Sequence, residues 1–200
     1  FTGSHNSIFG AYAGNAITTG FENVFMGSSS GVANTTGNTN TFVGTISGLS
    51  NTTGANNTFL GHASGKNNTT GTLNTFIGRN AGVANTTGNN NTMIGEGTGY
   101  NATAGSHNTF AGWVAGFNNQ AIGNVFYGSQ AGYSNTTGAN NLFMGTLSGY
   151  LNTTGNNNIF VGRTSGYNNL TGNDNVFMGN SSGSSNTTAN SNTFIGNIAG

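Results

Sequence analysis

Residues 40–56 read NTFVGTISGLSNTTGAN, and residues 57–73 read NTFLGHASGKNNTTGTL. Both stretches are variants of one 17-residue unit, with Asn, Phe and Gly at the same places in each. The central residue of the string Asn-x-Phe-x-Gly recurs at Ile8, Phe25, Phe42, Phe59, Phe76, Met93, Phe110, Phe126, Phe143, Phe160, Phe177 and Phe194. Successive steps are 17 residues long, except the step from Phe110 to Phe126, which is 16. Such a tandem repeat is typical of solenoid proteins, in which each repeat packs on its neighbours.

Each position of the unit keeps its residue type along the chain. Asn stands two positions before the central residue, and Gly stands two and six positions after it, in all twelve copies. A disordered chain has no reason to hold this register, and the repeated Gly excludes a helix of useful length. The β-branched and aromatic residues between Asn and Gly predict short strands. The predicted fold is therefore an all-β parallel β-solenoid (a β-roll or β-helix) of about twelve 17-residue coils.

The array is expected to form one unit over residues 1–200, with the one-residue deletion in the coil near residues 117–124. Both ends of the chain are in phase with the repeat, which indicates a segment of a longer fibre. Because stacked strands rise by about 4.8 Å, the eleven steps should span about 53 Å.

Stacking places each position above its own copy, so the Phe side chains should form a ladder inside the coil. The members of this core ladder are Phe25, Phe42, Phe59, Phe76, Phe110, Phe126, Phe143, Phe160, Phe177 and Phe194. Successive strand residues point to opposite faces, so the residues that follow Phe should form an apolar stripe on the other face. The members of this candidate oligomer stripe are Met26, Val43, Leu60, Ile77, Ile94, Met144, Val161, Met178 and Ile195.

An apolar patch of this length is seldom exposed on a soluble monomer. One interpretation is that three chains pack about a common axis and bury the stripe in a side-by-side homotrimer. The alternative is that a broad coil encloses both faces within one chain. Open coil ends are strand edges, so end-to-end filaments are a further form of self-association.

The Asn-Thr-Phe-Ile-Gly and Asn-Asn-Ile-Phe-Val-Gly units resemble the Asn-Ser-x-Ala-Ile-Gly repeats in the heads of trimeric autotransporter adhesins. They are also similar to Asn/Thr/Gly repeats of bacterial surface fibres and phage tail-fibre proteins. The resemblance covers essentially the whole chain, although the period of 17 and the Phe differ from the adhesin repeat. It implies a trimeric β-roll in an extracellular fibre, at a cell or virion surface, that mediates attachment to surface glycans or to a host-surface protein.

The composition excludes several functional classes. Only 3% of the residues are charged, which is too few for a nucleic-acid-binding face. There is no Cys for a disulfide or thiolate metal site. No run of about 18 apolar residues is present for a membrane span. No cofactor and no metal ion is expected.

The acid–base residues do not form a predicted catalytic group. They are Glu22, Glu96, Asp174, His5, His62, His107, Lys66, Arg79 and Arg163. His5 and His107 share a position but lie six coils apart, and Glu22 and Asp174 lie nine coils apart. We therefore expect the chain not to be an enzyme. Because a charged position would stack like charges about 4.8 Å apart, we expect the charges to be scattered among unlike positions.

One position carries aromatic residues on five consecutive coils. Its members are Tyr100, Phe117, Tyr133, Tyr150 and Tyr167, and they are a candidate ligand-facing ladder. Exposed aromatic rings can stack against sugars. The rings can equally stack on one another as a structural ladder, or lie in an interface between chains.

Three functions fit these features. The first is a structural and adhesive shaft or head of an extracellular fibre. The second is an ice-binding solenoid, since Thr precedes the central residue on five successive coils from Thr41 to Thr109. Valine, leucine and isoleucine follow in that position, which disfavours an ice-binding plane, and thermal hysteresis of the purified chain would discriminate. The third is a purely structural, filament-forming repeat.

Overall fold

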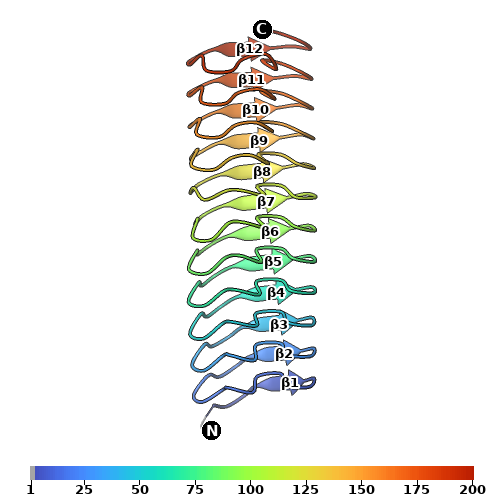
Figure 1. The fold of residues 1–200 in the computed structure, drawn as a ribbon, viewed down its shortest axis with the longest axis vertical. Coiled ribbons are helices and arrows are strands. Elements are labelled where there is room, and N and C mark those ends of the chain that lie inside the picture. The colour runs from blue at the N-terminus through green and yellow to red at the C-terminus, as the bar shows by residue number, and fades with distance from the viewer. Residues whose placement is uncertain (1–2) are drawn as a thin grey trace.

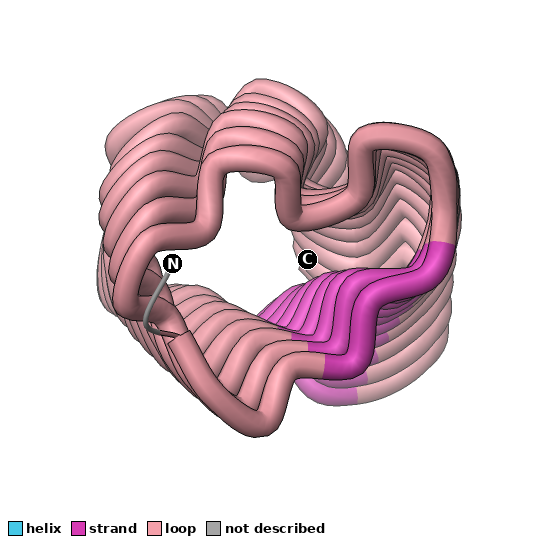
Figure 2. The backbone as a smooth tube through the Cα atoms, turned by 90° about the horizontal axis from the view of Figure 1, so that it is seen from below, coloured by secondary structure: helices cyan, strands magenta, loops and turns pink. Residues whose placement is uncertain are grey.

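Each coil of the computed structural model, which describes residues 3–200, contributes one three-residue strand. The strands are β1 (Ser7–Phe9), β2 (Val24–Met26), β3 (Thr41–Val43), β4 (Thr58–Leu60), β5 (Thr75–Ile77), β6 (Thr92–Ile94), β7 (Thr109–Ala111), β8 (Val125–Tyr127), β9 (Leu142–Met144), β10 (Ile159–Val161), β11 (Val176–Met178) and β12 (Thr193–Ile195). They form one parallel sheet in the order β1 to β12, and the coils stack along the long axis of the molecule (Figure 1). Turns make up the rest of each coil (Figure 2). The predicted parallel β-solenoid is confirmed.

The strands pair in strict repeat register. Phe25 lies beside Phe42, and Phe110 lies beside Phe126 across the 16-residue step. A turn absorbs the missing residue: the side chain of Asn119 donates to the carbonyl of Ala121, two residues away. The corresponding bond on the next coil, from Asn135 to Gly138, spans three residues. The strands and their interior side chains therefore continue in register through the shortened coil.

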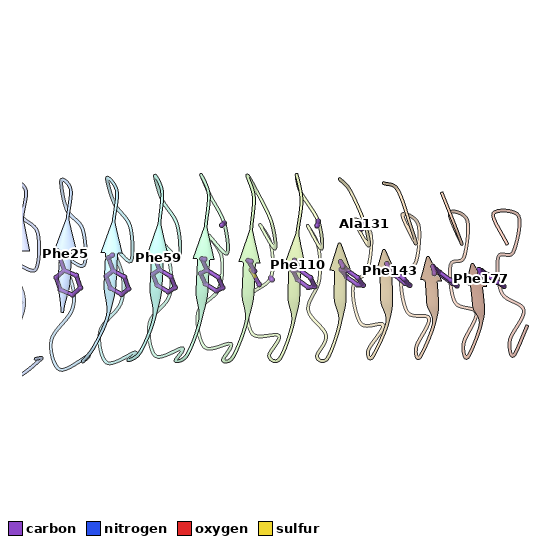
Figure 3. Packing of buried hydrophobic residues seen from close by; sticks show 14 of the residues in the cluster. Phe25, Phe59, Phe110, Ala131, Phe143 and Phe177 are labelled. Carbon is purple, nitrogen blue, oxygen red and sulfur yellow. The ribbon is translucent and has the colours of Figure 1, made fainter. Parts of the chain in front are cut away.

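The interior of the solenoid is a ladder of Phe rings (Figure 3). Nine of the ten predicted members, from Phe25 to Phe177, have no exposed surface, and Phe194 on the last coil is half-buried. Consecutive rings stack nearly parallel, with centroids 4.8 to 5.0 Å apart. Met93 replaces one ring and is also fully buried. Parallel rings at this spacing contact one another along the axis and form a continuous apolar interior.

Two of the repeated Gly positions are explained by close approach. A Cβ atom on Gly48 would lie 2.5 Å from the ring of Phe42, and the φ angle of Gly48 is +57°. A Cβ atom on Gly44 would lie 2.4 Å from the carbonyl oxygen of Gly61 on the next coil. The first Gly makes room for the Phe ladder, and the second lets the coils approach at the strand ends.

Two ladders of Asn side chains run beside the Phe ladder. In the first, the Asn23 side-chain oxygen accepts a hydrogen bond from the backbone N–H of Asn40 at 2.9 Å. In the second, the Asn51 amide donates to the Asn34 side-chain oxygen at 2.7 Å. Both Asn40 and Asn51 also donate to the carbonyl of Gly54. These contacts recur along the solenoid, so buried amides satisfy one another and the turn backbone.

Non-glycine residues also adopt left-handed backbone angles, which the sequence did not indicate. Such residues occur at only two positions of the unit, three before and four after the central residue. Ile46, which is β-branched, has a φ angle of +53°, an unfavourable conformation for such a residue. Its N–H donates to the carbonyl of Ser28 on the preceding coil at 2.9 Å. Hydrogen bonds between coils therefore hold conformations that the residue type alone disfavours.

The second Asn ladder has one gap. Ala102, which is 1% exposed, takes the place of Asn between Asn85 and Asn119. The side-chain oxygen of Asn85 then has no donor, and it is the one buried side-chain polar atom without a partner among residues 3–200. A buried unsatisfied acceptor costs about 1–3 kcal/mol. The gap is therefore a local weak point in the stack.

Replacing Ala102 with Asn should stabilise the protein. The new amide would donate to the side-chain oxygen of Asn85 and accept from Asn119, so the stability gain should be about 1–3 kcal/mol. Thermal and urea unfolding would measure it. Ala104→Thr is the matched control, because it restores the usual residue at an exposed position of the same turn and should change stability by less than about 0.5 kcal/mol. Equal effects of the two substitutions would contradict the ladder explanation.

Comparing Gly82→Ala with Gly99→Ala should separate the loss of stability due to a steric clash from the loss due to backbone strain. Both glycines have a φ angle of +56°, so the backbone strain is the same. A Cβ at Gly82 would meet the stacked ring of Phe76 at 2.6 Å, whereas a Cβ at Gly99 would meet the flexible side chain of Met93. We expect Gly82→Ala to destabilise by about 1–3 kcal/mol more, as measured by thermal unfolding. Equal losses would show that backbone strain dominates.

Candidate functional site

The candidate sites of this molecule lie on its outer surface. No pocket is found in the described part of the chain, and residues 3–200 contain no group of three or more His, Asp or Glu side chains suited to a metal ion. None of the described residues belongs to a helix long and apolar enough to cross a membrane. The surfaces to compare are therefore the outer face of the sheet, the aromatic ladder and the turn that follows each strand.

The candidate oligomer stripe lies on the outer face of the sheet. Its exposed members are Met26, Leu60, Ile94, Met144, Met178 and Ile195, and its half-buried members are Val43, Ile77 and Val161. The coil encloses the Phe ladder, whereas these side chains on the opposite face of the strands are exposed or half-buried. The interpretation that one chain encloses both faces is therefore wrong. The turns of the 17-residue coil close around one layer of side chains, and no chain remains to cover a second layer.

The residues before Phe widen this apolar face. Those of the first part, from Thr41 to Thr109, are threonines, and those of the second part include Val125 and Ile159, each 38% exposed. Each strand thus presents two outward side chains, one on either side of the inward Phe. From β2 to β12 the face is a strip of mainly aliphatic and threonine side chains, in which Tyr127 on β8 is an exposed aromatic residue.

The rings of the aromatic ladder stack on one another. Tyr100, Phe117, Tyr133, Tyr150 and Tyr167 stack in sequence, with centroids 5.0 to 5.3 Å apart. Tyr100 is 38% exposed and the other four are half-buried. A sugar that stacks on an aromatic residue needs a free ring face. Within the ladder each face is covered by the next ring, so the geometry favours the structural role over sugar stacking.

The Asn-Thr-Thr turns match the Asn-x-Thr acceptor pattern for N-linked glycosylation, but their Asn side chains are occupied by hydrogen bonds in the folded chain. Asn51 and Asn152 have no exposed surface. The Nδ2 atom of Asn51 donates to Asn34 and Gly54, and that of Asn152 donates to Asn135 and Gly155. An N-linked glycan on these amides would have to displace two hydrogen bonds inside the coil. The folded solenoid therefore protects these acceptor motifs.

One pair of charges is brought together, against the expectation that charges are scattered among unlike positions. Arg79 and Glu96 occupy the same position on adjacent coils, and their side chains form an ion pair at 3.0 Å. Stacking of like residues disfavours repeated like charges, but it favours opposite charges one coil apart. Arranging the charged residues by the 17-residue period would have revealed the pair, because 79 and 96 differ by one period.

Comparison with known proteins identifies no relative of this chain. It matches no protein-family model, no curated protein and no solved structure. The fold and the chemistry of the three outer surfaces are the basis for a functional proposal.

Proposed function

We propose that this chain is a structural and adhesive module of an extracellular fibre, a rigid shaft or head that projects from a cell or virion surface and mediates attachment. The observation that supports this most is the unbroken register of twelve parallel strands from β1 to β12. Apart from substitutions such as Met93 and Ala102, the interior repeats the same side chains from coil to coil, and no pocket opens within residues 3–200. A module of this form supplies length, stiffness and a repeated outer surface.

Stiffness follows from the contacts between coils. Backbone groups bond to the coils before and after, as Thr41 does to Asn57 and Ile46 does to Ser28. Stacked Phe rings and Asn amides add side-chain contacts at each level. In a solenoid these nearest-neighbour contacts add along the axis, so bending the rod requires separating several ladders together. Eleven intervals of about 4.8 Å give a rod of about 53 Å.

The open sheet face supports a side-by-side homotrimer. Its exposed aliphatic side chains run the length of the rod, from Met26 to Ile195. Burying apolar surface contributes about 25 cal/mol per Å2, and a strip of this length offers the same gain at each level. Three copies about a common axis would cover all three strips by closed symmetry. The low charge of the chain leaves little electrostatic repulsion between such copies.

The trimer predicts a mass of about 60 kDa, three times the 20.2 kDa of one chain. Ile77→Glu combined with Met144→Glu should reduce this mass to that of a monomer, because each charge would be buried in the interface. These positions are several coils apart, so the two charges do not stack on each other. Thr45→Glu, at an exposed position outside the sheet face, is the control and should leave the trimer intact. Light scattering makes the measurement, and a wild-type mass of one chain would refute the trimer.

Attachment is tested with beads that carry the purified chain. We expect these beads to bind at least one surface in a panel of bacterial and animal cells. Beads carrying the Phe76→Glu variant, which places a charge in the Phe ladder and should unfold the coil, are the control. Electron microscopy first establishes that the wild-type chain forms a rod. A rod that binds no surface in the panel would leave a purely structural role and contradict the adhesive one.

A further inference from the structure

Four chemically distinct side chains form a line on the turn that follows strands β4 to β7. The residues are His62, Arg79, Glu96 and Trp113, each three positions after the central residue of its coil. Their carbonyls accept hydrogen bonds from the next coil at 2.9 to 3.0 Å, so the line follows the stack. Three intervals of about 4.8 Å give it a length of about 14 Å. Each member lies two residues after the end of its strand, in the turn and not in the sheet.

The line concentrates the unusual residues of the chain. The same position on most other coils holds a small or polar residue, as with Ser28, Thr45, Ser129 and Thr146. On these four consecutive coils it holds two of the six charged residues, one of the three His and the only Trp. The unit otherwise repeats its residue types closely. Varied polar and aromatic residues on a rigid scaffold are the usual composition of a recognition surface.

The ion pair within the line adds little to folding. Arg79 and Glu96 are joined at 3.0 Å, and their side chains are 66% and 52% exposed. A pair this exposed contributes little to stability because water already solvates both charges. The contact does align a guanidinium and a carboxylate one coil apart. Both groups keep free hydrogen-bonding atoms directed to solvent, since each has more donors or acceptors than the pair uses.

Trp113 supplies an apolar surface beside these charges. Its side chain is 54% exposed, unlike the rings of the stacked aromatic ladder. Gly112 precedes it and Ala111 is the residue before that, so the backbone next to the ring carries little bulk. Trp113 occupies the same position as Glu96 on the next coil, and the adjacent residue Val114 donates its N–H to the carbonyl of Glu96. An accessible indole next to an aligned carboxylate and guanidinium combines stacking with charge-assisted hydrogen bonding.

We propose that His62, Arg79, Glu96 and Trp113 form a binding site for an extended carbohydrate chain. A sugar ring can place its C–H face on the indole of Trp113 while its hydroxyl groups bond to Glu96 and Arg79. His62, on the coil before Arg79, extends the hydrogen-bonding line by one coil for a further sugar unit. The site is a surface line and not a pocket, which suits a chain more than a single small molecule. The proposal rests on the attachment function above and names the partner class.

A carbohydrate fits this line better than a protein partner does. A stable protein interface buries about 800 Å2 on each side around an apolar centre. The line has one apolar side chain and is bordered by the glycines that end the strands, such as Gly78 and Gly95. Carbohydrate recognition at one such line should be weak. Repetition on neighbouring copies in a fibre would raise the overall affinity by multivalency.

The single Trp makes the site directly observable. Intrinsic Trp fluorescence should shift and saturate when the purified chain is titrated with the oligosaccharide that binds, in a panel of cello-, chito- and malto-oligosaccharides and sialyllactose at millimolar concentrations. Calorimetry then compares variants with the wild type. Trp113→Ser, which installs the residue found at Ser129, should abolish binding without loss of the fold. Glu96→Gln and Arg79→Gln should each weaken binding by about tenfold or more.

Two matched controls test the location. Arg163→Gln changes the same position on a distant coil, and Tyr150→Ser changes the stacked aromatic ladder; neither should alter the affinity. The inference is overturned if no member of the panel shifts the fluorescence. It is also overturned if Trp113→Ser keeps the wild-type affinity, or if Tyr150→Ser abolishes binding.

The cell-binding assay separates this inference from the attachment function. Cells are treated with glycosidases before they meet the protein-coated beads. Loss of bead binding supports a carbohydrate partner. Binding that persists, and is unaffected by Trp113→Ser, keeps the attachment function, overturns the carbohydrate site and indicates a protein receptor. Oligosaccharide binding without any cell binding keeps the site and contradicts the attachment function.

Discussion

Every residue in this protein must tolerate a copy of its own position one coil away, about 4.8 Å above and below. Phe meets this constraint by parallel stacking at 4.8 to 5.0 Å, and Asn meets it by donating to the next Asn. Gly meets it where a Cβ would strike a carbonyl of the next coil. A repeated like charge does not meet it. The composition of the chain, rich in Asn, Gly and Thr and poor in charge, follows from this one requirement.

The same constraint explains where the pattern fails and what the failures do. Ala102 interrupts an Asn ladder and leaves the side-chain oxygen of Asn85 without a donor. The one-residue deletion between Asn119 and Ala121 is absorbed in a turn, because the strands carry the stacking and the turn does not. Arg79 and Glu96 place opposite charges on adjacent coils, which is the one charged arrangement that stacking favours. Departures from the repeat are therefore of two kinds: some disturb a ladder inside the coil, and others change the chemistry of the outer surface.

The candidate surfaces differ in how many of their side-chain groups remain available to bind a partner. In the ladder from Tyr100 to Tyr167, each ring face is covered by the neighbouring ring. The sheet face is apolar and continuous, which suits contact with further copies of the chain. The line that ends at Trp113 keeps an exposed ring, a carboxylate and a guanidinium. In a fibre these roles are compatible, since the sheet and the turn that follows it are different segments of each coil (Figure 2).

The period of 17 residues determined most of the fold by itself. It identified the strands, their register and the inward Phe, because a residue that recurs once per coil can only lie above its own copy. The sequence alone did not show which faces the coil leaves open, that the aromatic rings cover one another, or that Ile46 adopts a left-handed backbone. The period aligns Arg79, Glu96 and Trp113, but it did not show that their side chains are exposed. These features depend on how the turns close and on hydrogen bonds between coils, which no single repeat contains, so only the tertiary structure decided them.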